Sequence, residues 1–494
     1  MKLKDIPLAV RQIAFRLLKN NFEAYIVGGC VRDLLIGHEP KDWDIATSAR
    51  PEEIQKLFPE SIYENRFGTV GIKTKSRNPH LQIVEATTFR TETVYSDKRH
   101  PDKIEFAKTI EEDLARRDFT INALALALKP KLYLIDPFAG QKDLKEKIIR
   151  AVRDPEARFK EDALRLMRAI RFNVELGQRN GWKIEEETFK AIKKNASNLR
   201  YISKERIRDE LIKILMAPEA AEGILLLEKA GLLKFILPEL EEGIGVTQNK
   251  HHLYTVFEHN VYSLAYAAQK NYSLAVRLAA LLHDIGKPRA KRGEGKDATF
   301  YGHEVLSAKL SQKILERLKF PTDLINKVVT LVRYHGFVYE VGVTTDSSLR
   351  RLLVKVGKDN IEELAKVREA DRIGSGCPKA LPFKLRYFLF RIEKILKEQK
   401  GEEPSLKMLK IDGHEVMKIL KISPGPKVGY ILNILLEEIL DHPEYNRKSW
   451  LKKRVKELGA LSEKELALKN KLAKDKYLEV LEDFQERIRK KYYV

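Results

Sequence analysis

One short stretch near the start of the chain constrains the fold more than any other. It opens with an apolar run at 24–27, continues with Gly28 and Gly29, and then reads CVRDLLIG. The run predicts a β-strand, the paired glycines predict a turn, and the leucines predict a helix. Backbone N–H groups of such a turn, together with the helix N-terminus, can approach a phosphate. The stretch therefore predicts an α/β fold with an anion site beside its first strand.

Two aspartates follow in the sequence KDWDIA at 41–46. Alternate side chains share one face of a strand, so a strand here places Asp42 and Asp44 together and Trp43 opposite. Two carboxylates held this close repel each other unless a cation lies between them, which suits a divalent metal. A lone D-x-D is more often a solvated turn. Beside a phosphate-binding turn, however, metal-bridging carboxylates are what nucleotidyl transfer requires.

GGCVRDLLIG and KDWDI together resemble the first motif of the class II tRNA nucleotidyltransferases and bacterial poly(A) polymerases, a branch of the DNA polymerase β-like superfamily. The resemblance implies an α/β nucleotidyltransferase head followed by all-α neck, HD body and tail domains. It implies that Asp42 and Asp44 are catalytic ligands of Mg²⁺. Glu85, in a strand expected over 81–86, resembles the third carboxylate of such a site. A polar residue within a sheet, with no metal nearby, would look the same. The nucleotide-binding residues implied here are Gly28, Gly29 and Arg32.

The charge balance indicates a polyanionic partner. The 494 residues include 92 Lys and Arg against 71 Asp and Glu, a formal net charge of +21. Counterion release drives such proteins onto nucleic acid, although Lys and Glu are also abundant in thermophile proteins. Cys30 and Cys377 are too few for a disulfide framework, which fits a reducing cytoplasm. The first 20 residues predict an amphipathic helix rather than a signal peptide, and no apolar run is long enough to span a membrane.

The stretch RRDFTINALA at 116–125 predicts an amphipathic helix, on which Asp118 and Asn122 are neighbours. A capping network could explain these polar residues without any ligand. The string also resembles the second motif of the family, RRDFTxNA. That motif implies that Arg117, Asp118 and Asn122 contact the ribose and phosphates of the incoming nucleotide. DPFAG at 136–140 resembles the third motif, and we expect it to form a structural turn into the next helix.

The string EDALRLMRAIRF at 161–172 places Asp162, Arg165 and Arg168 on one face of a predicted helix. An Asp–Arg pair at this spacing is ordinarily a weak surface salt bridge, but the two side chains can also hydrogen-bond the edge of a base. The string resembles the fourth motif, E-D-x-x-R. This implies that Asp162 and Arg165 select the incoming base and that Arg168 also binds the nucleotide. SKERIRDEL at 203–211 resembles the fifth motif and predicts a helix that supports the fourth.

Histidines gather in the second half of the chain. The string ALLHDIGKP contains His283 and Asp284 and resembles the HD phosphohydrolase superfamily, whose metal site activates water. A transition metal suits imidazole and carboxylate together better than Mg²⁺ does. The alternative is a retained HD fold whose histidines are structural. The metal candidates implied by the resemblance are His259, His283, Asp284, His303, His335 and Asp371.

Four domains are expected. They are a catalytic head (1–140), a helical neck with the base-selecting motif (141–236), an HD-type helical body (237–400) and a helical tRNA-binding tail (401–494). In the tail, PGPKVG at 424–429 suits an RNA backbone and resembles the element with which the family's tail meets the tRNA elbow. Ordinary helix-ending turns would look the same. Residues 461–494 predict a charged helix with no chemistry that we can assign.

Enzymes of three kinds share these motifs: those that add CCA to tRNA, those that add only CC or only A, and those that add poly(A) tails. The sequence NRFGTV at 65–70 looks more like the tRNA enzymes than like the poly(A) polymerases. CC-adding members lack much of the loop that this chain keeps at 89–106, a polar segment expected to be mobile. We therefore expect addition of the terminal A, or of the whole CCA, to tRNA from ATP and CTP, with release of pyrophosphate. An HD phosphohydrolase acting on RNA ends is the alternative from another class.

Overall fold

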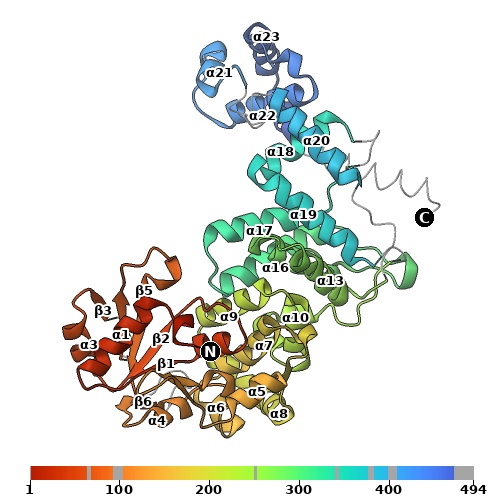
Figure 1. The fold of residues 1–494 in the computed structure, drawn as a ribbon. Helices are drawn as coiled ribbons and strands as arrows, with labels where there is room; N and C mark the ends of the chain where they lie inside the picture. The colour runs from red at the N-terminus through yellow and green to blue at the C-terminus, as the bar shows by residue number, and fades with distance from the viewer. Residues whose placement is uncertain are drawn as a thin grey trace. The chain divides into compact units, whose positions relative to one another are not determined.

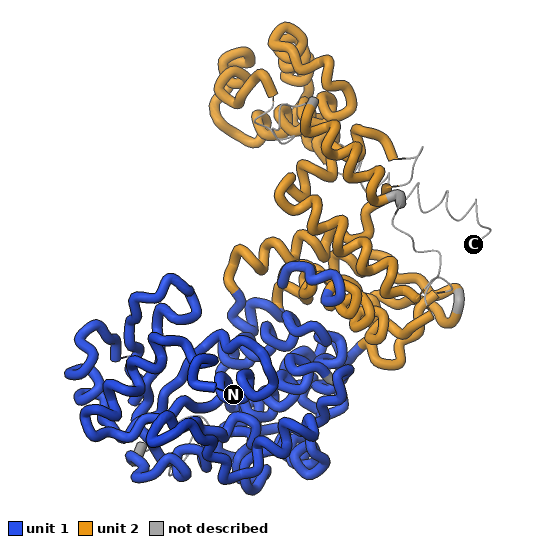
Figure 2. The backbone as a smooth tube through the Cα atoms, in the orientation of Figure 1, with its two compact units in different colours: residues 1–242, 268–274, 314–320 blue, residues 243–267, 275–313, 321–494 orange. Residues whose placement is uncertain are grey.

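The structure is a computed structural model in which the chain divides into two compact units (Figure 2). Unit 1 comprises residues 1–242, 268–274 and 314–320, and unit 2 comprises residues 243–267, 275–313 and 321–494. The structure describes residues 2–63, 68–92, 104–249, 253–339, 344–376, 383–398 and 409–471. The border after Glu242 falls near the expected end of the neck at residue 236. The finer division into four domains stays a prediction.

Unit 1 is built around a seven-stranded mixed sheet in the order β3-β4-β5-β2-β1-β8-β9 (Figure 1). Strand β2 lies in the middle of the sheet, antiparallel to β1 and parallel to β5. The strands are β1 (Ala24–Val27), β2 (Asp44–Thr47), β3 (Ser61–Tyr63), β4 (Thr69–Lys73), β5 (Ile83–Thr88), β8 (Ala125–Ala127) and β9 (Tyr133–Ile135). The strand expected at 24–27 is confirmed, and the strand expected at 81–86 is displaced toward its C-terminal end.

Short helices accompany the sheet. They are α1 (Leu8–Lys19), α2 (Gly29–Leu35), α3 (Pro51–Leu57), α4 (Ile110–Ala115) and α5 (Gly140–Glu146). The expected helix after the paired glycines is confirmed as α2, and Gly28 adopts a φ of 81° that only glycine takes readily. Helix α4 packs Ile110 and Leu114 into the same buried apolar cluster as Val27 of β1 and Ala125 of β8. This packing fixes the segment before the second motif against the central strands.

The segment 89–106, expected to be a loop, is strand at both described ends. β6 (Arg90–Glu92) and β7 (Ile104–Phe106) pair antiparallel. The guanidinium of Arg50 lies 4.7 Å from the centre of the Phe106 ring, which fixes the second strand. The sequence missed these strands because the charges between them dominate the composition. Residues 93–103, where the remainder of the expected loop falls, lie outside the described residues.

The helix expected over 116–125 is wrong. Helix α4 ends at Ala115, and a 3₁₀ turn, η3 (Thr120–Asn122), leads directly into β8. The cause is local: the carboxylate of Asp118 accepts the backbone N–H of Phe119 at 2.8 Å and the side-chain amide of Asn122 at 3.1 Å. Such side-chain bonds to nearby donors compete with helix formation. The expected proximity of Asp118 and Asn122 is confirmed.

The expected structural turn at 136–140 is confirmed. Asp136 follows β9, and its carboxylate accepts the backbone N–H groups of Gly140 at 2.7 Å and Gln141 at 2.9 Å. These bonds satisfy two donors at the start of α5. A Cβ on Gly140 would lie 2.2 Å from the carbonyl oxygen of Thr120, so the helix start is in contact with the second motif.

The rest of unit 1 is mainly helical. Its helices are α6 (Pro155–Glu161), α7 (Leu164–Leu176), α8 (Glu186–Asn195), α9 (Lys204–Met216), α10 (Ala220–Lys229), α11 (Leu233–Ile236) and α12 (Pro238–Glu241), with two short strands, β10 (Ile148–Ile149) and β11 (Lys183–Ile184). Asp162, expected within a helix, instead lies between α6 and α7. Its carboxylate accepts the backbone N–H of Leu164 at 3.0 Å, so it closes the start of α7.

Helices make up most of the described part of unit 2. They are α13 (Val256–Gln269), α14 (Leu274–Leu282), α15 (Lys287–Ala290), α16 (His303–Arg317), α17 (Thr322–Tyr334), α18 (Asp346–Val356), α19 (Lys358–Gly374), α20 (Phe383–Glu398), α21 (Gly413–Leu420), α22 (Pro426–Asp441) and α23 (Lys448–Gly459), of which α13, α14 and α16 share their ends with unit 1. The last three helices share a buried apolar core that includes Val416, Ile431 and Leu451. Pro426 of the glycine-rich tail element is the first residue of α22.

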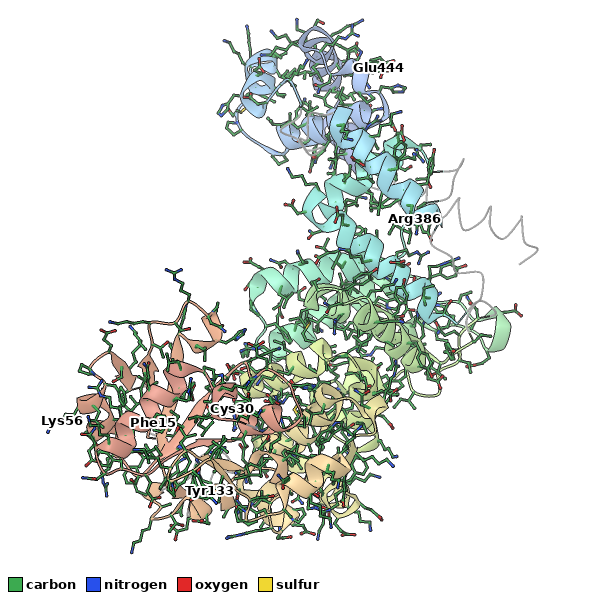
Figure 3. The ribbon with its side chains drawn as sticks, in the orientation of Figure 1. Phe15, Cys30, Lys56, Tyr133, Arg386 and Glu444 are labelled. Atoms are coloured by element: carbon green, nitrogen blue, oxygen red, sulfur yellow. The ribbon has the colours of Figure 1, made fainter. Side chains whose placement is uncertain are left out.

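Cys30, marked in Figure 3, is buried on α2 with a free thiol. Burial and the nearby Asp44 raise its pKa to about 12. Cys377 lies outside the described residues. Across the described segments, no helix has both the length and the apolar character needed to cross a bilayer.

Candidate active site and metal centre

A cavity of about 1300 Å³ in unit 1 brings the first, second and fourth motifs together. The predicted nucleotide and metal residues that line it are Gly29, Arg32, Asp42, Asp44, Arg117, Asp118, Asn122, Asp162, Arg165 and Arg168. Its volume is sufficient for a nucleoside triphosphate. A smaller cavity of about 220 Å³ shares Asp44 and Arg117 with the first and is also lined by Glu85.

The carboxylates lie at the N-terminal end of strand β2. Asp44 is the first residue of the strand, and Asp42 lies just before it, so the expected alternation along a strand is only partly formed. Trp43 is 4% exposed, as predicted for the residue opposite the pair. Asp44 pairs in register with Glu85 of β5, which confirms the expected place of Glu85 beside the aspartate strand. Asp44 and Glu85 are therefore neighbours on adjacent strands, and Asp42 lies two residues before Asp44.

The electrostatics of Asp44 favour a bound cation. Burial raises the pKa of the Asp44 carboxyl; the guanidinium of Arg117 lowers it, and the charge of Asp42 raises it further. A carboxylate whose charge is destabilised in this way gains stability when a divalent ion binds beside it. The donor atoms are carboxylate oxygens alone, and such hard ligands fit Mg²⁺. The residues present therefore fit the metal that the family resemblance implies.

The glycine turn lets an arginine approach the first strand. A Cβ on Gly28 would lie 2.6 Å from Nη1 of Arg117, so the missing side chain leaves room for that guanidinium. Arg117 also pairs with the buried carboxylate of Asp113 at 3.3 Å, and Arg116 pairs with the same carboxylate at 2.9 Å. One buried acid thus holds the two arginines of the second motif, a role that the sequence did not suggest for Asp113.

A chain of hydrogen bonds connects three motifs. Arg32 donates from Nη1 to Oδ1 of Asn122 at 2.9 Å, and Asn122 donates to Oδ1 of Asp118 at 3.1 Å. Arg168 donates to the other oxygen of Asp118 at 2.8 Å. Burial alone would raise the pKa of Asp118, but Arg168 and Asn122 hold it below its usual range. The polar residues of the second motif are therefore satisfied by one another while they line the cavity.

Asp162 and Arg165 line the cavity but do not pair with each other. Arg206 of α9 donates to both carboxylate oxygens of Asp162, with Nη2 2.7 Å from Oδ2. Arg165 pairs with Glu161 at 2.7 Å and donates to the carbonyl of Arg116 at 2.9 Å. The expected placement of Asp162 and Arg165 on one face of a helix is therefore wrong, because Asp162 precedes helix α7. Helical spacing in ERIRDEL predicts a supporting helix but does not reveal that Arg206 contacts Asp162.

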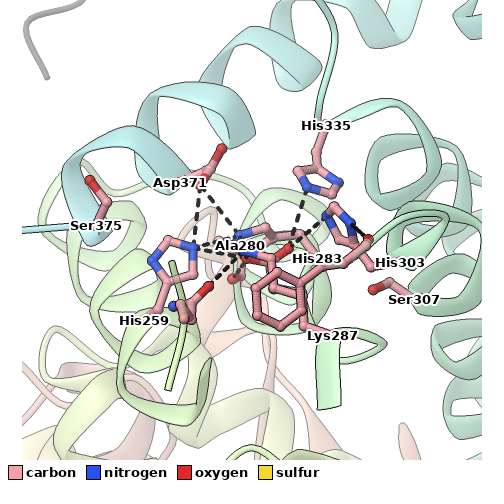
Figure 4. Close-up of polar contacts among 12 residues, drawn as sticks. His259, Ala280, His283, Lys287, His303, Ser307, His335, Asp371 and Ser375 are labelled. Atoms are coloured by element: carbon pink, nitrogen blue, oxygen red, sulfur yellow. Dashed lines mark hydrogen bonds and ion pairs between the residues drawn. The ribbon is translucent and has the colours of Figure 1, made fainter. Parts of the chain in front are cut away.

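The six candidate residues of the HD motif come together in unit 2 (Figure 4). Around Asp284, Oδ2 lies 3.2 Å from Nε2 of His259 and 3.3 Å from Nε2 of His283, and Oδ1 lies 3.2 Å from Nε2 of His303 and 3.6 Å from Nε2 of His335. Asp371 completes the first group, with Oδ1 3.3 Å from Nε2 of His259. Asp284 thus faces one set of ligands with each oxygen.

Backbone carbonyls fix the orientation of three of these imidazoles. Nδ1 lies 2.9 Å from the Ala280 carbonyl in His283, 2.7 Å from the Phe300 carbonyl in His303, and 2.7 Å from the Val332 carbonyl in His335. A carbonyl accepts only an N–H, so Nδ1 carries a proton in each ring and Nε2 is the atom presented to the cluster. This arrangement is typical of metal-binding histidines.

Charge accumulates in the HD cluster. Burial lowers the pKa of His283, but Asp284 and Asp371 outweigh burial and raise it to about 10. Lys287, which the sequence did not single out, places Nζ 2.6 Å from Oδ2 of Asp284 and holds the pKa of that carboxyl well below its usual range. Mixed imidazole and carboxylate donors fit a transition metal.

Comparison with known proteins shows which family this chain resembles. Family models match residues 24–150 (Poly A polymerase head domain), 181–244 (Probable RNA and SrmB-binding site of polymerase A) and 256–375 (HD domain). The A-adding tRNA nucleotidyltransferase of Deinococcus radiodurans is 36% identical over 426 residues, which cover 84% of this chain and 91% of that protein.

Two further similarities agree with the first. The CCA-adding enzyme of Ligilactobacillus salivarius is 47% identical over 228 residues, which cover 45% of this chain and only 54% of that protein. The crystal structure of the Bacillus stearothermophilus CCA-adding enzyme in complex with CTP covers 92% of this chain and 98% of its own, with 27% identity and a TM-score of 0.67. The chain belongs to the tRNA nucleotidyltransferase family.

Proposed function

We propose that the chain adds AMP, or the whole CCA sequence, to the 3′ end of tRNA, with ATP and CTP as donors. The observation that carries the proposal is the composition of the cavity in unit 1. Asp42 and Asp44, several arginines, and the two residues Asp162 and Arg165 all line it. Carboxylates, cations and a base-reading pair in one cavity are the groups that template-independent nucleotidyl transfer needs. The net charge of +21 suits an RNA substrate.

Asp42 and Asp44 would hold Mg²⁺, with Glu85 as the third carboxylate beside them. When bound, Mg²⁺ supplies a lowered pKa for the attacking 3′-hydroxyl and charge neutralisation for the triphosphate. The protein's own contribution is to fix these groups in place. Arg32 and Arg117 offer guanidinium donors to the phosphates, and Asn122, held between Arg32 and Asp118, can contact the ribose.

Base selection is assigned to Asp162 and Arg165. Cytosine and adenine both carry an exocyclic amino donor, at N4 and N6, which a carboxylate can accept, whereas uracil and guanine carry a carbonyl there. Asp162 therefore discriminates against UTP and GTP. Arg206 orients that carboxylate by contacting both of its oxygens. The switch from C to A is assigned to the segment 90–103, of which residues 93–103 lie outside the described residues.

The decisive experiment supplies tRNA ending at the discriminator base, at C, or at CC, with each nucleotide given singly. Incorporation of A into tRNA-CC alone indicates an A-adding enzyme. Incorporation of C into the two shorter substrates as well indicates a CCA-adding enzyme. Long A tracts on unrelated RNA, or no incorporation into any tRNA, would overturn the proposal.

A second activity is favoured by the HD cluster. Three of its four imidazoles are oriented by backbone carbonyls, and its carboxylates are buried among them, as a metal-dependent hydrolase requires. We assign it phosphoester hydrolysis, with a transition metal such as Mn²⁺, Ni²⁺ or Fe²⁺ supplying an activated water when bound. Hydrolysis of a 2′,3′-cyclic phosphodiester by the metal-loaded protein tests this assignment, and a lack of turnover with all three metals contradicts it.

A further inference from the structure

Phe172 of helix α7 occupies an unusual position in the nucleotide cavity. The side chain is 5% exposed, and it contributes to the wall of the cavity. Three guanidinium groups lie over its ring, with Cζ 5.2 Å from the ring centre for Arg32, 5.3 Å for Arg168 and 4.0 Å for Arg171. An aromatic face attracts a cation through its quadrupole, and the attraction is strongest where water is excluded.

The three arginines come from two helices, α2 and α7. Arg171 directly precedes Phe172, and Arg168 lies one helical turn earlier on α7. Arg32 comes from α2, next to the glycine turn of the first motif. Phe119 of the second motif meets the ring edge-on, at 5.7 Å between ring centres and an interplanar angle of 83°. One phenyl ring therefore contacts side chains from the first, second and fourth motifs.

Each arginine is also anchored by an acid. Arg32 pairs with Asp33 at 2.7 Å, Arg168 with Asp118 at 2.6 Å, and Arg171 with Glu210 at 2.8 Å. Three like charges gathered at one ring would otherwise repel one another. The acids supply the balancing charge, and the π-electrons of the ring attract each of the guanidinium groups. A guanidinium presents five N–H donors, so an acid and a ring leave donors for an anionic ligand.

We propose that Phe172 is a positioning residue for the triphosphate of the incoming nucleotide, because it holds three arginines from two parts of unit 1 around one aromatic ring. The inference rests on the proposed nucleotidyl transfer and adds a residue that neither touches the reacting atoms nor reads the base. All three arginines line the cavity. Phe172 acts through them, so its loss affects phosphate binding more than base choice.

The test varies the ring while its size stays nearly constant. Phenylalanine with one, two and three ring fluorines, placed at position 172, weakens the quadrupole in steps. Phe172→Tyr and Phe172→Trp keep it, and Phe172→Leu removes it. We expect the Kd for ATP to rise stepwise with fluorination and to reach about ten-fold or more in Phe172→Leu. The Tyr and Trp variants should retain most of the affinity, and the ratio of ATP to GTP incorporation should stay at the parent value.

Phe159→Leu is the matched packing control. Phe159 is fully buried on α6 of the same unit, and within the described part of the chain no cation is recorded over its ring. A Kd for ATP that is unchanged across the fluorinated series would overturn the inference. So would an equal loss in Phe159→Leu and Phe172→Leu. Because ATP binding is measured without tRNA, failure of the parent protein to extend any tRNA would count against the proposed function and not against this inference.

Discussion

The two metal-binding candidates of this chain are assembled in opposite ways. In unit 1, the carboxylates of Asp42 and Asp44 stand at the end of a strand, and the neighbouring cations are arginines that line an open cavity. In unit 2, Asp284 is enclosed by four imidazoles and a lysine, and backbone carbonyls orient three of those imidazoles. The first group offers oxygen ligands beside a large cavity, and the second is a compact, buried set of mixed ligands.

The pKa shifts express the same contrast. Burial and its neighbouring aspartate raise the pKa of Asp44, with only Arg117 opposing them, whereas Lys287 and His283 outweigh burial and lower the pKa of Asp284. The protein balances the charge of Asp44 only in part, whereas it supplies Asp284 with positive charge from Lys287 and His283.

The largest effect is expected from Asp42→Ala or Asp44→Ala. Nucleotide addition should fall by about a thousand-fold or more, because metal stabilisation of the transition state is worth several kcal/mol. tRNA affinity, measured by filter binding, should stay close to that of the parent protein. Residual addition within about tenfold of the parent rate would remove these residues from the chemistry.

Replacing both His283 and Asp284 by alanine tests the second region. Bound transition metal, measured by elemental analysis after dialysis, should be lost together with any phosphodiesterase activity. Nucleotide addition should be retained, since the two chemistries use different residues. Circular dichroism checks that the variant is folded, because removing Asp284 leaves the ammonium of Lys287 without that partner. Equal loss of both activities would mean that the histidines have a structural role.

A smaller effect is expected at Asp162 and Arg206, for which we proposed a role in base selection. Asp162→Ala should reduce discrimination among the four nucleotides by about ten- to a hundred-fold, the equivalent of roughly 1–3 kcal/mol. Arg206→Gln should act in the same direction and more weakly, because it leaves the carboxylate present but less firmly oriented. Arg208→Gln on the same helix serves as the control. Unchanged ratios of ATP, CTP, GTP and UTP incorporation in Asp162→Ala would show that the residue only caps a helix.

The smallest effect is a change in how the melting temperature depends on pH, and it concerns a second buried acid of unit 1, Asp118. The pKa of Asp118 is lowered in the folded protein, so its ion pair with Arg168 contributes stability that is fully present above the unfolded-state pKa of about 3.9. That contribution is lost as the pH falls from there through the folded-state pKa. Melting temperatures between pH 5 and pH 2 should therefore decline less steeply in Asp118→Asn than in the parent. Parallel curves would contradict the assigned shift.

Local patterns predicted the elements that local chemistry determines. The strand at 24–27 and the helix after the glycines follow from an apolar run and from glycine geometry, and both form. The HD ligands could be named individually because each belongs to a short string. Each orienting carbonyl lies three positions before its histidine, so these bonds are local. The sequence could not show that rings from three different segments would meet at Asp284, since that depends on the fold.

The predictions failed where side chains override the helical pattern. Asp118 and Asp162 each sit in a segment with helical spacing, yet each carboxylate bonds a nearby backbone N–H and interrupts the helix. Arg206 illustrates a second limit, because its partner lies 44 positions away in the chain. The contacts that set up the cavity are thus mainly long-range polar pairs, which periodicity does not report.

The contact between Gly140 and Thr120 has a consequence for genetic variation. The carbonyl oxygen of Thr120 lies where any β-carbon at position 140 would need to be, at 2.2 Å, and the obstacle is backbone rather than a movable side chain. Even alanine would push the start of α5 away from the second motif. We therefore expect codon 140 to tolerate only synonymous change, although Gly140 does not line the large cavity of unit 1. In a saturation library grown under selection for tRNA maturation, missense alleles at this codon should be depleted as strongly as those at Asp42 and Asp44.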